Sequence, residues 1–265
     1  MIISILGCGW LGFPLAKHLV HKGHVVKGST TSKEKLELLQ AESIAPFLIR
    51  LTPELETPKK NTDFWNANVL VLNIPPGRKR DDVIELHIRQ ILSVKKAVIN
   101  SPIEFVIFVS STSVYPKFAG AVGEADTMPG KAGSDSGNAL LQAEKILLQN
   151  PSFETTVIRF GGLTGGNRNP VKYMTGKKDL PNGNAPVNMI HRDDCIAIIS
   201  QIIEEKITGE IFNAVSDDHS ARKEYYTQAA KNLNLKPPTF SEDRETNHKL
   251  VKNDKLKSRL GYIFT

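Results

Sequence analysis

The sequence predicts an α/β fold built on a doubly wound, mostly parallel sheet. Short apolar runs alternate with segments of helical periodicity along residues 1–160, and the first run is followed by a glycine-rich turn that opens a helix. Strands that alternate with helices are typical of a parallel sheet that carries helices on both faces. The sequence holds no internal repeat and no low-complexity segment that would indicate another architecture.

The glycine-rich turn follows the expected strand Ile2–Leu6 and has the spacing Gly7-x-Gly9-x-x-Gly12. In a dinucleotide site the first glycine permits a tight turn, the second lets the backbone approach a pyrophosphate, and the third lets the helix pack close to the strand. Trp10 and Leu11 lie inside the turn, so we expect them at the same site. The alternative is that the glycines only shape a tight turn between a strand and a helix.

The remaining elements continue the alternation. Expected strands are Val25–Ser29, Phe47–Leu51, Val69–Leu72, Phe105–Ser110 and Thr155–Phe160, and expected helices are Lys33–Ala41, Asp81–Ile99 and Gly137–Gln149. After Gly161 come loops rich in Gly, Asn and Lys, and then the segments Ile190–Glu205, Ile211–Val215 and Lys223–Asn234. We predict a dinucleotide-binding Rossmann core over residues 1–160 and a smaller substrate-binding lobe over residues 161–265, packed on the same domain.

Composition narrows the class of protein. The chain has 265 residues, of which 40% are hydrophobic and 23% charged, as is ordinary for a globular protein. No apolar run approaches the ~18 residues of a membrane span, and the N-terminus has no basic segment or cleavage site, so we expect a cytoplasmic protein. Two cysteines, Cys8 and Cys195, are too few for a metal cluster, so no metal site is expected.

The net charge of +6 does not by itself indicate a nucleic-acid partner, because Lys and Arg are scattered and no RRM, KH or zinc-finger pattern is present. We expect a small polar or anionic molecule as the partner, with no nucleic acid and no membrane. Whether the chain forms a homodimer stays open.

The end of the second strand bears on which dinucleotide binds. A site for NAD usually has Asp or Glu there, about 20 residues after the glycines, to hold the ribose 2′-hydroxyl. This chain has Ser29, Thr30, Thr31 and Lys33 instead, and its first carboxylate is Glu34. Hydroxyls and a Lys charge suit a 2′-phosphate, so NADP is the preferred cofactor and NAD the alternative. The same residues would also suit a hydroxyl-rich helix N-cap.

A row of hydroxyls, residues 110–113, ends a buried strand just before Val114-Tyr115. Further landmarks are the glycine turn, Ala143-Glu144, Arg159-Phe160-Gly161-Gly162-Leu163 and Asn188-Met189-Ile190-His191-Arg192-Asp193-Asp194. Together they resemble the extended short-chain dehydrogenases/reductases of the NAD-dependent epimerase/dehydratase group. Within that group the chain resembles an atypical, YeeZ-like subgroup, which opens with the same Gly-x-Gly-Trp-Leu-Gly and carries a similar Ser-Ser-Thr-Ser-Val-Tyr.

The resemblance implies hydride exchange at a nicotinamide, with a nucleotide sugar or a related polar molecule as substrate. It implies a catalytic hydroxyl four residues before the tyrosine, which is Ser111, with Thr112 as the second candidate. Such a hydroxyl would donate a hydrogen bond to a substrate oxygen whose charge changes during hydride transfer. Cofactor contacts are expected at Ile74, Pro75, Pro76 and Ser110. The alternatives are hydroxyls that only cap a strand end and a turn that proline stiffens.

The family's acid and base are a Tyr-x-x-x-Lys on the next helix, and here the chain departs from the resemblance. Counting back from Glu144 puts Ser136 at the tyrosine and Leu140 at the lysine, and neither can do that pair's work. Substitutes available in the sequence are Tyr115, Tyr173, Glu124 and Asp126. Two functions therefore stay open: an NAD(P)-dependent epimerase/dehydratase-like oxidoreductase, and an NADP-binding sensor or regulatory protein without catalysis.

Substrate contacts are expected in the second half of the chain, at Arg159, Arg168, Asn188 and His191. A guanidinium offers a planar fork for a phosphate or carboxylate, and Lys172, Lys177 and Lys178 add charge near Arg168. The alternatives are an exposed basic loop and, for His191, a polar corner before a capped helix.

Overall fold

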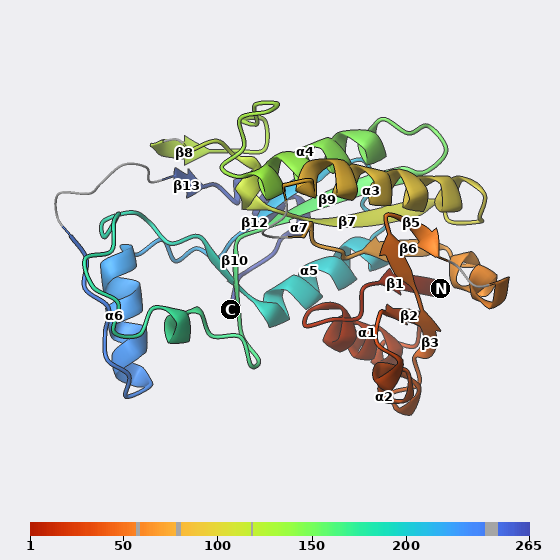
Figure 1. The fold of residues 1–265 in the computed structure, drawn as a ribbon, viewed down its shortest axis with the longest axis horizontal. Coiled ribbons are helices and arrows are strands. Elements are labelled where there is room, and N and C mark those ends of the chain that lie inside the picture. The colour runs from red at the N-terminus through yellow and green to blue at the C-terminus, as the bar shows by residue number, and fades with distance from the viewer. Residues whose placement is uncertain (57–58, 78–80, 118, 242–248) are drawn as a thin grey trace.

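A computed structural model describes residues 1–56, 59–77, 81–117, 119–241 and 249–265. Its centre is a seven-stranded sheet in the order β12-β9-β7-β6-β1-β2-β3, with every neighbouring pair parallel (Figure 1). The chain first winds from β1 towards β3 and then from β6 towards β12, so the strand order reverses between β1 and β6. The predicted doubly wound α/β fold is confirmed.

The strands of this sheet are short and apolar, because helices cover both of its faces. All four residues of Val69–Leu72 are buried. The register brings Ile5 beside Val71, and Val71 beside Ile107. The strands are β1 (Ile2–Leu6), β2 (Val25–Thr30), β3 (Ala45–Leu48), β6 (Val69–Leu72), β7 (Phe105–Ser111), β9 (Glu154–Phe160) and β12 (Ile211–Ala214).

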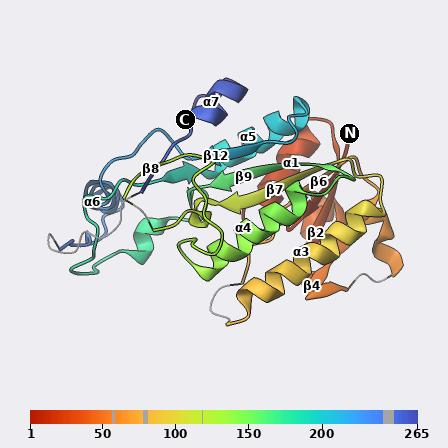
Figure 2. The same cartoon turned by 90° about the horizontal axis from the view of Figure 1, so that it is seen from above.

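Helices lie in two layers, one on each face of the sheet (Figure 2). One layer holds α3 (Val83–Ile99) and α4 (Asp135–Leu148), and the other holds α1 (Gly12–His21), α2 (Leu36–Ala41), α5 (Arg192–Glu204) and α7 (Asp254–Leu260). On α1, for example, Leu15, Ala16 and Leu19 form the buried stripe. Each layer encloses its own apolar core against the sheet.

Shorter elements form the rim of the molecule. Two-stranded pairs are β4 (Arg50–Thr52) with β5 (Glu54–Glu56), β8 (Gly120–Val122) with β13 (Lys249–Val251), and β10 (Gly162–Thr164) with β11 (Met189–His191). The 3-10 helices are η1 (Lys33–Lys35), η2 (Lys59–Trp65), η3 (Thr112–Val114) and η4 (Pro170–Tyr173). Helix α6 (Arg222–Asn232) contacts η4 and lies away from the main sheet (Figure 1).

Two expected elements are corrected. The helix expected over Lys33–Ala41 is a 3-10 turn followed by α2, because the Lys35 amide bonds to the Ser32 carbonyl and starts a tighter turn. The strand expected over Phe47–Leu51 ends at Leu48 and a new one begins at Arg50, because residues from Arg50 onward pair with β5 instead.

The second half of the chain also completes the main sheet. Strand β12 pairs with β9, and α5 packs against α1. Residues beyond 160 therefore supply part of the sheet and its cover as well as the loops around η4. Assignment of residues 161–265 as the substrate-binding part stays a prediction.

Candidate functional site

A cavity of about 820 Å³ opens where the carboxyl ends of β1, β2, β6 and β7 meet. This edge includes the point between β1 and β6 where the strand order reverses, which is where doubly wound proteins bind their ligands. Gly161, Gly162, Leu163 and Arg168 from the loops after β9 line it too, as does Lys249 from β13. A cavity of this size can hold a large cofactor or substrate fragment.

The glycine turn forms one wall of the cavity, and its three glycines have different surroundings. Gly7 has a φ of +112°, and a Cβ there would collide with the carbonyl oxygen of Asn73. A Cβ at Gly12 would collide with the carbonyl oxygen of Gly7, whereas a Cβ at Gly9 would meet nothing within 4 Å. Gly7 and Gly12 are thus needed for the turn itself, and the space beside Gly9 is open for a ligand.

Two polar side chains hold this turn against its neighbours. Asn73 Nδ2 donates to the Gly7 carbonyl at 3.0 Å, and the Gly7 amide donates to Ser29 Oγ at 2.9 Å. Asn73 lines the cavity and was missed from the sequence, although its place directly after β6 was a usable signal. The first turn of α1 has no acidic side chain, so its amides offer an anion site without a competing carboxylate.

Ser29, Thr30 and Thr31 all line the cavity, and the hydroxyl oxygens of the first two each accept a backbone amide, which leaves their protons available to a ligand. Ser29 Oγ accepts the Gly7 amide, and Thr30 Oγ1 accepts the Ser32 amide at 3.2 Å. Thr31 is exposed at the cavity edge. Contact of these three residues with a 2′-phosphate stays a prediction.

The cation beside Thr31 is Lys35, and Lys33 lies outside the lining. Lys35 is therefore the better-placed cation, and contact of Lys33 with a 2′-phosphate stays a prediction. Both residues belong to one 3-10 turn, on which residues two apart point in different directions, so only one of them can face the cavity. Arg50 adds a second cation near this end, because its Nε and Nη2 each donate to the Thr31 carbonyl at 3.3 Å.

The hydroxyl row at the end of β7 lines the opposite part of the cavity, from Ser110 to Ser113. Ser110 Oγ donates to Glu144 Oε1 at 2.6 Å, so its proton is already used. Ser111 Oγ accepts the Ser113 amide at 3.2 Å, which leaves the Ser111 proton available to a ligand. This geometry suits the donor role expected for Ser111.

Ser136 and Leu140 both line the cavity, on the face of α4 that turns towards the hydroxyl row. Ser136 Oγ lies 3.5 Å from the Gly77 carbonyl. Helix α4 approaches so closely that a Cβ at Gly137 would collide with the Ser113 carbonyl. The two positions at which the resemblance expects Tyr and Lys therefore reach the cavity, but carry side chains that cannot replace that pair.

Sequence similarity to a known protein identifies the family of this chain. The chain is 31% identical over 264 residues to "Protein YeeZ" of Escherichia coli (strain K12), which covers 99% of this chain and 95% of the relative. The chain belongs to the YeeZ family. No protein-family model matches it.

Solved structures with the same fold as this YeeZ-family chain include dinucleotide-dependent enzymes. A UDP-glucuronic acid 4-epimerase from Bacillus cereus in complex with NAD has a TM-score of 0.81 at 18% identity, covering 100% of this chain and 94% of that one. A short-chain dehydrogenase/reductase superfamily protein from Agrobacterium tumefaciens with bound NAD has a TM-score of 0.78 at 14% identity, covering 100% and 93%. A UDP-glucose 4-epimerase from Thermotoga maritima with UDP-glucose has a TM-score of 0.78 at 15% identity, covering 100% and 94%.

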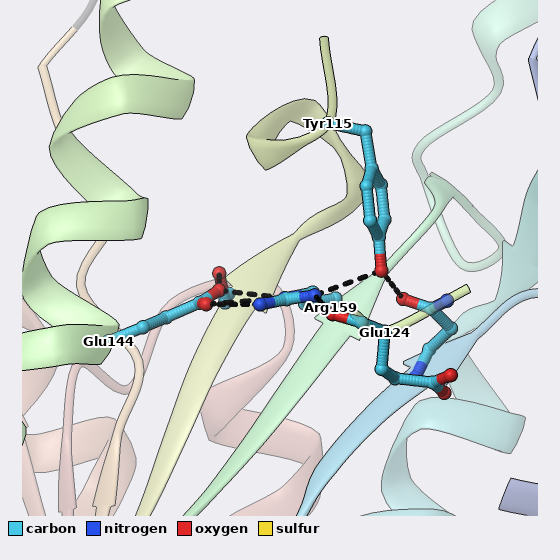
Figure 3. A network of polar contacts seen from close by, with 6 residues as sticks. Tyr115, Glu124, Glu144 and Arg159 are labelled. Carbon is cyan, nitrogen blue, oxygen red and sulfur yellow. Dashed lines mark hydrogen bonds and ion pairs between the residues drawn. The ribbon is translucent and has the colours of Figure 1, made fainter. Parts of the chain in front are cut away.

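In the YeeZ-family chain the buried Arg159 belongs to a network of polar contacts with Glu144, Tyr115 and Glu124 (Figure 3). Its Nη2 lies 2.6 Å from Glu144 Oε2, and its Nη1 donates to Tyr115 Oη at 2.9 Å and to the Glu124 carbonyl at 2.8 Å. Arg159 does not line the cavity. This corrects the expectation that it holds an anionic substrate, because its donors are used inside the protein.

The same network accounts for two of the substitute acid–base candidates. Tyr115 Oη donates to Asn213 Oδ1 at 2.6 Å, and burial raises the pKa of this phenol despite the nearby Arg159. Glu124 Oε1 accepts the Asn213 amide at 2.8 Å. Neither residue lines the cavity, so both are corrected from candidate bases to members of the network.

Four other expected residues also lie outside the lining. Asn188 bridges to β13, and the nitrogen Nδ1 of His191 accepts the Asp193 amide at 3.3 Å, which is the capped corner that the sequence left as an alternative. Asp126 Oδ2 accepts the Gly123 amide at 2.8 Å, and Tyr173 is 74% exposed on η4. The expectation of substrate contact at Asn188 is corrected, since both its polar side-chain atoms bond to β13. For His191 the contact stays a prediction, since its Nδ1 caps α5 and the residue does not line the cavity.

Other expected residues do reach the cavity: Trp10, Leu11, Ile74, Pro75, Pro76, Thr112 and Arg168. Arg168 and Arg192 lie over the ring of Trp10, with Cζ atoms 5.4 and 5.6 Å from its centroid. Lys172, Lys177 and Lys178 are not in the lining. Contact of the lining residues with a ligand stays a prediction.

Cys8 and Cys195 are buried thiols, and burial raises the pKa of Cys8 to about 12 and that of Cys195 well above its usual value. In the part of the chain that the structure describes, no group of three His, Cys, Asp or Glu side chains could hold a metal ion. No helix among the described residues is long and apolar enough to cross a membrane.

Proposed function

We propose that this chain binds NADP(H) in the cavity, with NAD(H) as the weaker ligand, and exchanges a hydride with a nucleotide sugar or a similar polar molecule. The observation that carries the proposal is the open space beside Gly9, at the start of α1, in the same cavity as Ser111. Full-length similarity to YeeZ and a fold shared with NAD-bound epimerases support it. The NAD and UDP-sugars in those structures suggest the chemical class of both ligands.

A bound nicotinamide would accept or supply the hydride. The residues of this chain would bind and orient the cofactor. The α1 amides and the Gly9 backbone bind the pyrophosphate, and Thr31 and Lys35 bind the 2′-phosphate. Ser111 Oγ donates a hydrogen bond to the substrate oxygen, which orients the substrate and stabilises its developing charge.

The charges around the cavity favour anionic ligands. Lys35, Arg168 and Lys249 line it, and no Asp or Glu is among the described lining residues. A cleft lined by one sign of charge raises the local concentration of oppositely charged ligands. The absence of a carboxylate at the end of β2 removes the usual partner of the NAD ribose and favours the additional phosphate of NADP.

Calorimetric titration with NADPH and NADH tests the cofactor assignment. We expect NADPH to bind more tightly than NADH, and Lys35→Glu to weaken NADPH by at least about tenfold while leaving NADH nearly unchanged, because only NADPH carries the 2′-phosphate. Lys33→Glu is the matched control, since it makes the same charge change outside the cavity. Equal weakening by the two variants would remove the 2′-phosphate assignment.

A second function, an NADP-binding sensor without catalysis, is favoured by Ser136 and Leu140 at the cavity wall. Incubation with NADP⁺ and UDP-glucose or UDP-glucuronic acid, followed by nicotinamide absorbance, separates the two functions. As an enzyme, the wild type turns over and Ser111→Ala loses about 10²-fold or more, because a donor to the substrate oxygen is missing. Cofactor binding without turnover of either sugar favours the sensor.

A further inference from the structure

The cavity contains few groups that can exchange a proton. None of its described lining residues is Asp, Glu, His or Tyr, and the ionisable ones are Cys8, Lys35, Arg168 and Lys249. Burial holds Cys8 as a neutral thiol, and a guanidinium does not lose its proton in proteins. Lys35 follows β2, at the end of the cavity beside Thr31. Lys249 is therefore the one described candidate beside the hydroxyl row.

Lys249 reaches this position from a distant part of the chain. Its Nζ donates to the Thr112 carbonyl at 2.7 Å and lies 5.6 Å from the centroid of the Tyr115 ring. Thr112 directly follows Ser111, so the amine stands next to the hydroxyl expected to contact the substrate. Lys249 could not be identified from the sequence, because 137 positions separate it from Thr112.

The backbone of Lys249 is fixed from two sides. Strand β13 pairs with β8, and Lys249 lies opposite Gly120 in that pair. The side chain of Asn188 bridges the same strand: its Nδ2 donates to the Lys249 carbonyl at 2.9 Å, and its Oδ1 accepts the Val251 amide at 2.8 Å. Asn188 thus positions Lys249, although it does not line the cavity itself.

We propose that Lys249 is the acid–base residue of this cavity, in place of the Tyr and Lys that α4 lacks. The proposal rests on the proposed function. When a substrate hydroxyl is oxidised, its C–H bond breaks and the hydride goes to the nicotinamide of NAD(P)⁺, while its O–H bond breaks and the proton goes to the neutral Lys249 amine. In the reverse direction the Lys249 ammonium returns the proton to the carbonyl oxygen.

The surroundings of Lys249 suit this role. Burial lowers the pKa of its ammonium, which increases the fraction of neutral amine at a given pH. Lys249 lies over the ring of Tyr115, and the Arg159 guanidinium lies 5.3 Å from the centroid of the same ring. The α4 residues that line the same cavity, Ser136 and Leu140, are uncharged. In the described part of the chain Lys249 forms no ion pair with a carboxylate that would hold its charge.

A purely structural role predicts different behaviour from a catalytic one. If Lys249 only tied η3 to β13 through the Thr112 carbonyl, Lys249→Arg would keep both the charge and a donor, and turnover would survive. If Lys249 moves the proton, Lys249→Arg and Lys249→Met should both lose about 10²–10⁴-fold in hydride transfer from UDP-glucose or UDP-glucuronic acid. The wild-type oxidation rate should rise with pH through the lowered pKa of Lys249, and this rise should vanish in Lys249→Arg.

Chemical labelling of the lysines tests the role of Lys249 without a substrate. Competitive acetylation with acetic anhydride is followed for each lysine by mass spectrometry. It measures the pH at which each amine reaches half of its maximal reactivity. Repeating it with NADP⁺ shows which amines the cofactor protects from acetylation. Lys252 is the matched control, because it lies three positions away and is exposed. We expect Lys249 to reach half reactivity at lower pH than Lys252, and saturating NADP⁺ to suppress acetylation of Lys249 but not of Lys252. Lys35, which is proposed to hold the 2′-phosphate, should be protected as well.

The possible outcomes distinguish a failure of the Lys249 assignment from a failure of the proposed function. If calorimetry shows that NADP⁺ binds but Lys249 titrates like Lys252 and is not protected, the proposed function stands and the Lys249 assignment is overturned. Turnover of Lys249→Arg at the wild-type rate overturns it as well. If neither NADP⁺ nor NAD⁺ binds, the proposed function fails and the Lys249 role fails with it.

Discussion

Gly9 differs from the other two glycines of its motif, because the fold itself does not require a glycine at this position. A Cβ there would meet no atom within 4 Å, whereas a Cβ at Gly7 or Gly12 would collide with a backbone carbonyl oxygen. Gly7 and Gly12 are therefore required by the path of the chain, whereas the structure itself leaves room for a side chain at Gly9. The proposed pyrophosphate site would explain a glycine there.

We expect Gly9→Ala to fold with an unchanged urea unfolding midpoint and to bind NADPH at least about tenfold more weakly, because the added methyl group occupies the space of the pyrophosphate. Unfolding curves and calorimetry measure the two effects. Gly12→Ala is the control: it should lower the free energy of unfolding, since the Gly7 carbonyl has to move. Wild-type affinity in Gly9→Ala would show that no ligand approaches this backbone closely.

Among elements, β9 and α4 are joined by an ion pair that is almost fully buried. Arg159 on β9 is 1% exposed and Glu144 on α4 is 2% exposed, and Nη2 lies 2.6 Å from Oε2. Ser110 on β7 donates to the same carboxylate. Glu144 thus connects α4, which carries Ser136 and Leu140, to β9 through Arg159 and to β7, which carries the hydroxyl row, through Ser110.

We expect Glu144→Gln to lower the free energy of unfolding by about 3–5 kcal/mol, because it leaves the Arg159 charge buried without its counterion. The pair Lys17–Glu42, which is only half-buried and has an N–O distance of 2.7 Å, supplies the control. Glu42→Gln should cost no more than about 1 kcal/mol. Urea unfolding of both variants measures the difference, and equal losses would mean that burial of the Glu144 pair has no energetic consequence.

At the scale of elements, the positions of Ser136 and Leu140 on α4 follow from the family resemblance, and both side chains line the cavity. Helical spacing relates Ser136, Leu140 and Glu144 as successive turns of one face, and the structure brings the first two to the cavity and the third to Arg159. The sequence did not predict the position of the Arg159 side chain, because an arginine in an apolar strand can turn to either face of the sheet. Which face it takes depends on Glu144, a partner 15 residues away.

Across the whole molecule, the alternation of strands and helices predicted the sheet because each βα unit is local in sequence. Long-range pairing could not be predicted in the same way. The contact of β13 with β8, which brings Lys249 to Thr112, links segments about 130 residues apart through three-residue strands with no periodicity of their own. Lys35 was missed for a local reason, since a 3-10 turn rotates side chains differently from the α-helix expected there.

Tyr262 and Thr265, near the C-terminus, contact Asp194 at the start of α5. Tyr262 Oη donates to Asp194 Oδ1 at 2.8 Å, and the Thr265 amide and Oγ1 lie 3.3 and 3.1 Å from the same oxygen. Asp194 is 1% exposed, so these donors supply its hydrogen bonds in the interior. Burial, together with the hydrogen bond and charge of Asp194, raises the pKa of Tyr262.

A raised phenol pKa makes stability fall as the pH rises. Above about pH 10 the unfolded chain loses the Tyr262 proton while the folded chain keeps it, so the free energy of unfolding declines until the folded pKa is reached. We expect Tyr262→Phe to be about 1 kcal/mol less stable at neutral pH, because Asp194 loses a donor, and to decline less steeply between about pH 9 and pH 11. Tyr173→Phe, at an exposed tyrosine, should follow the wild type throughout. Urea unfolding across this range measures the slopes, and parallel curves for Tyr262→Phe and the wild type would show that the phenol does not keep its proton through its contact with Asp194.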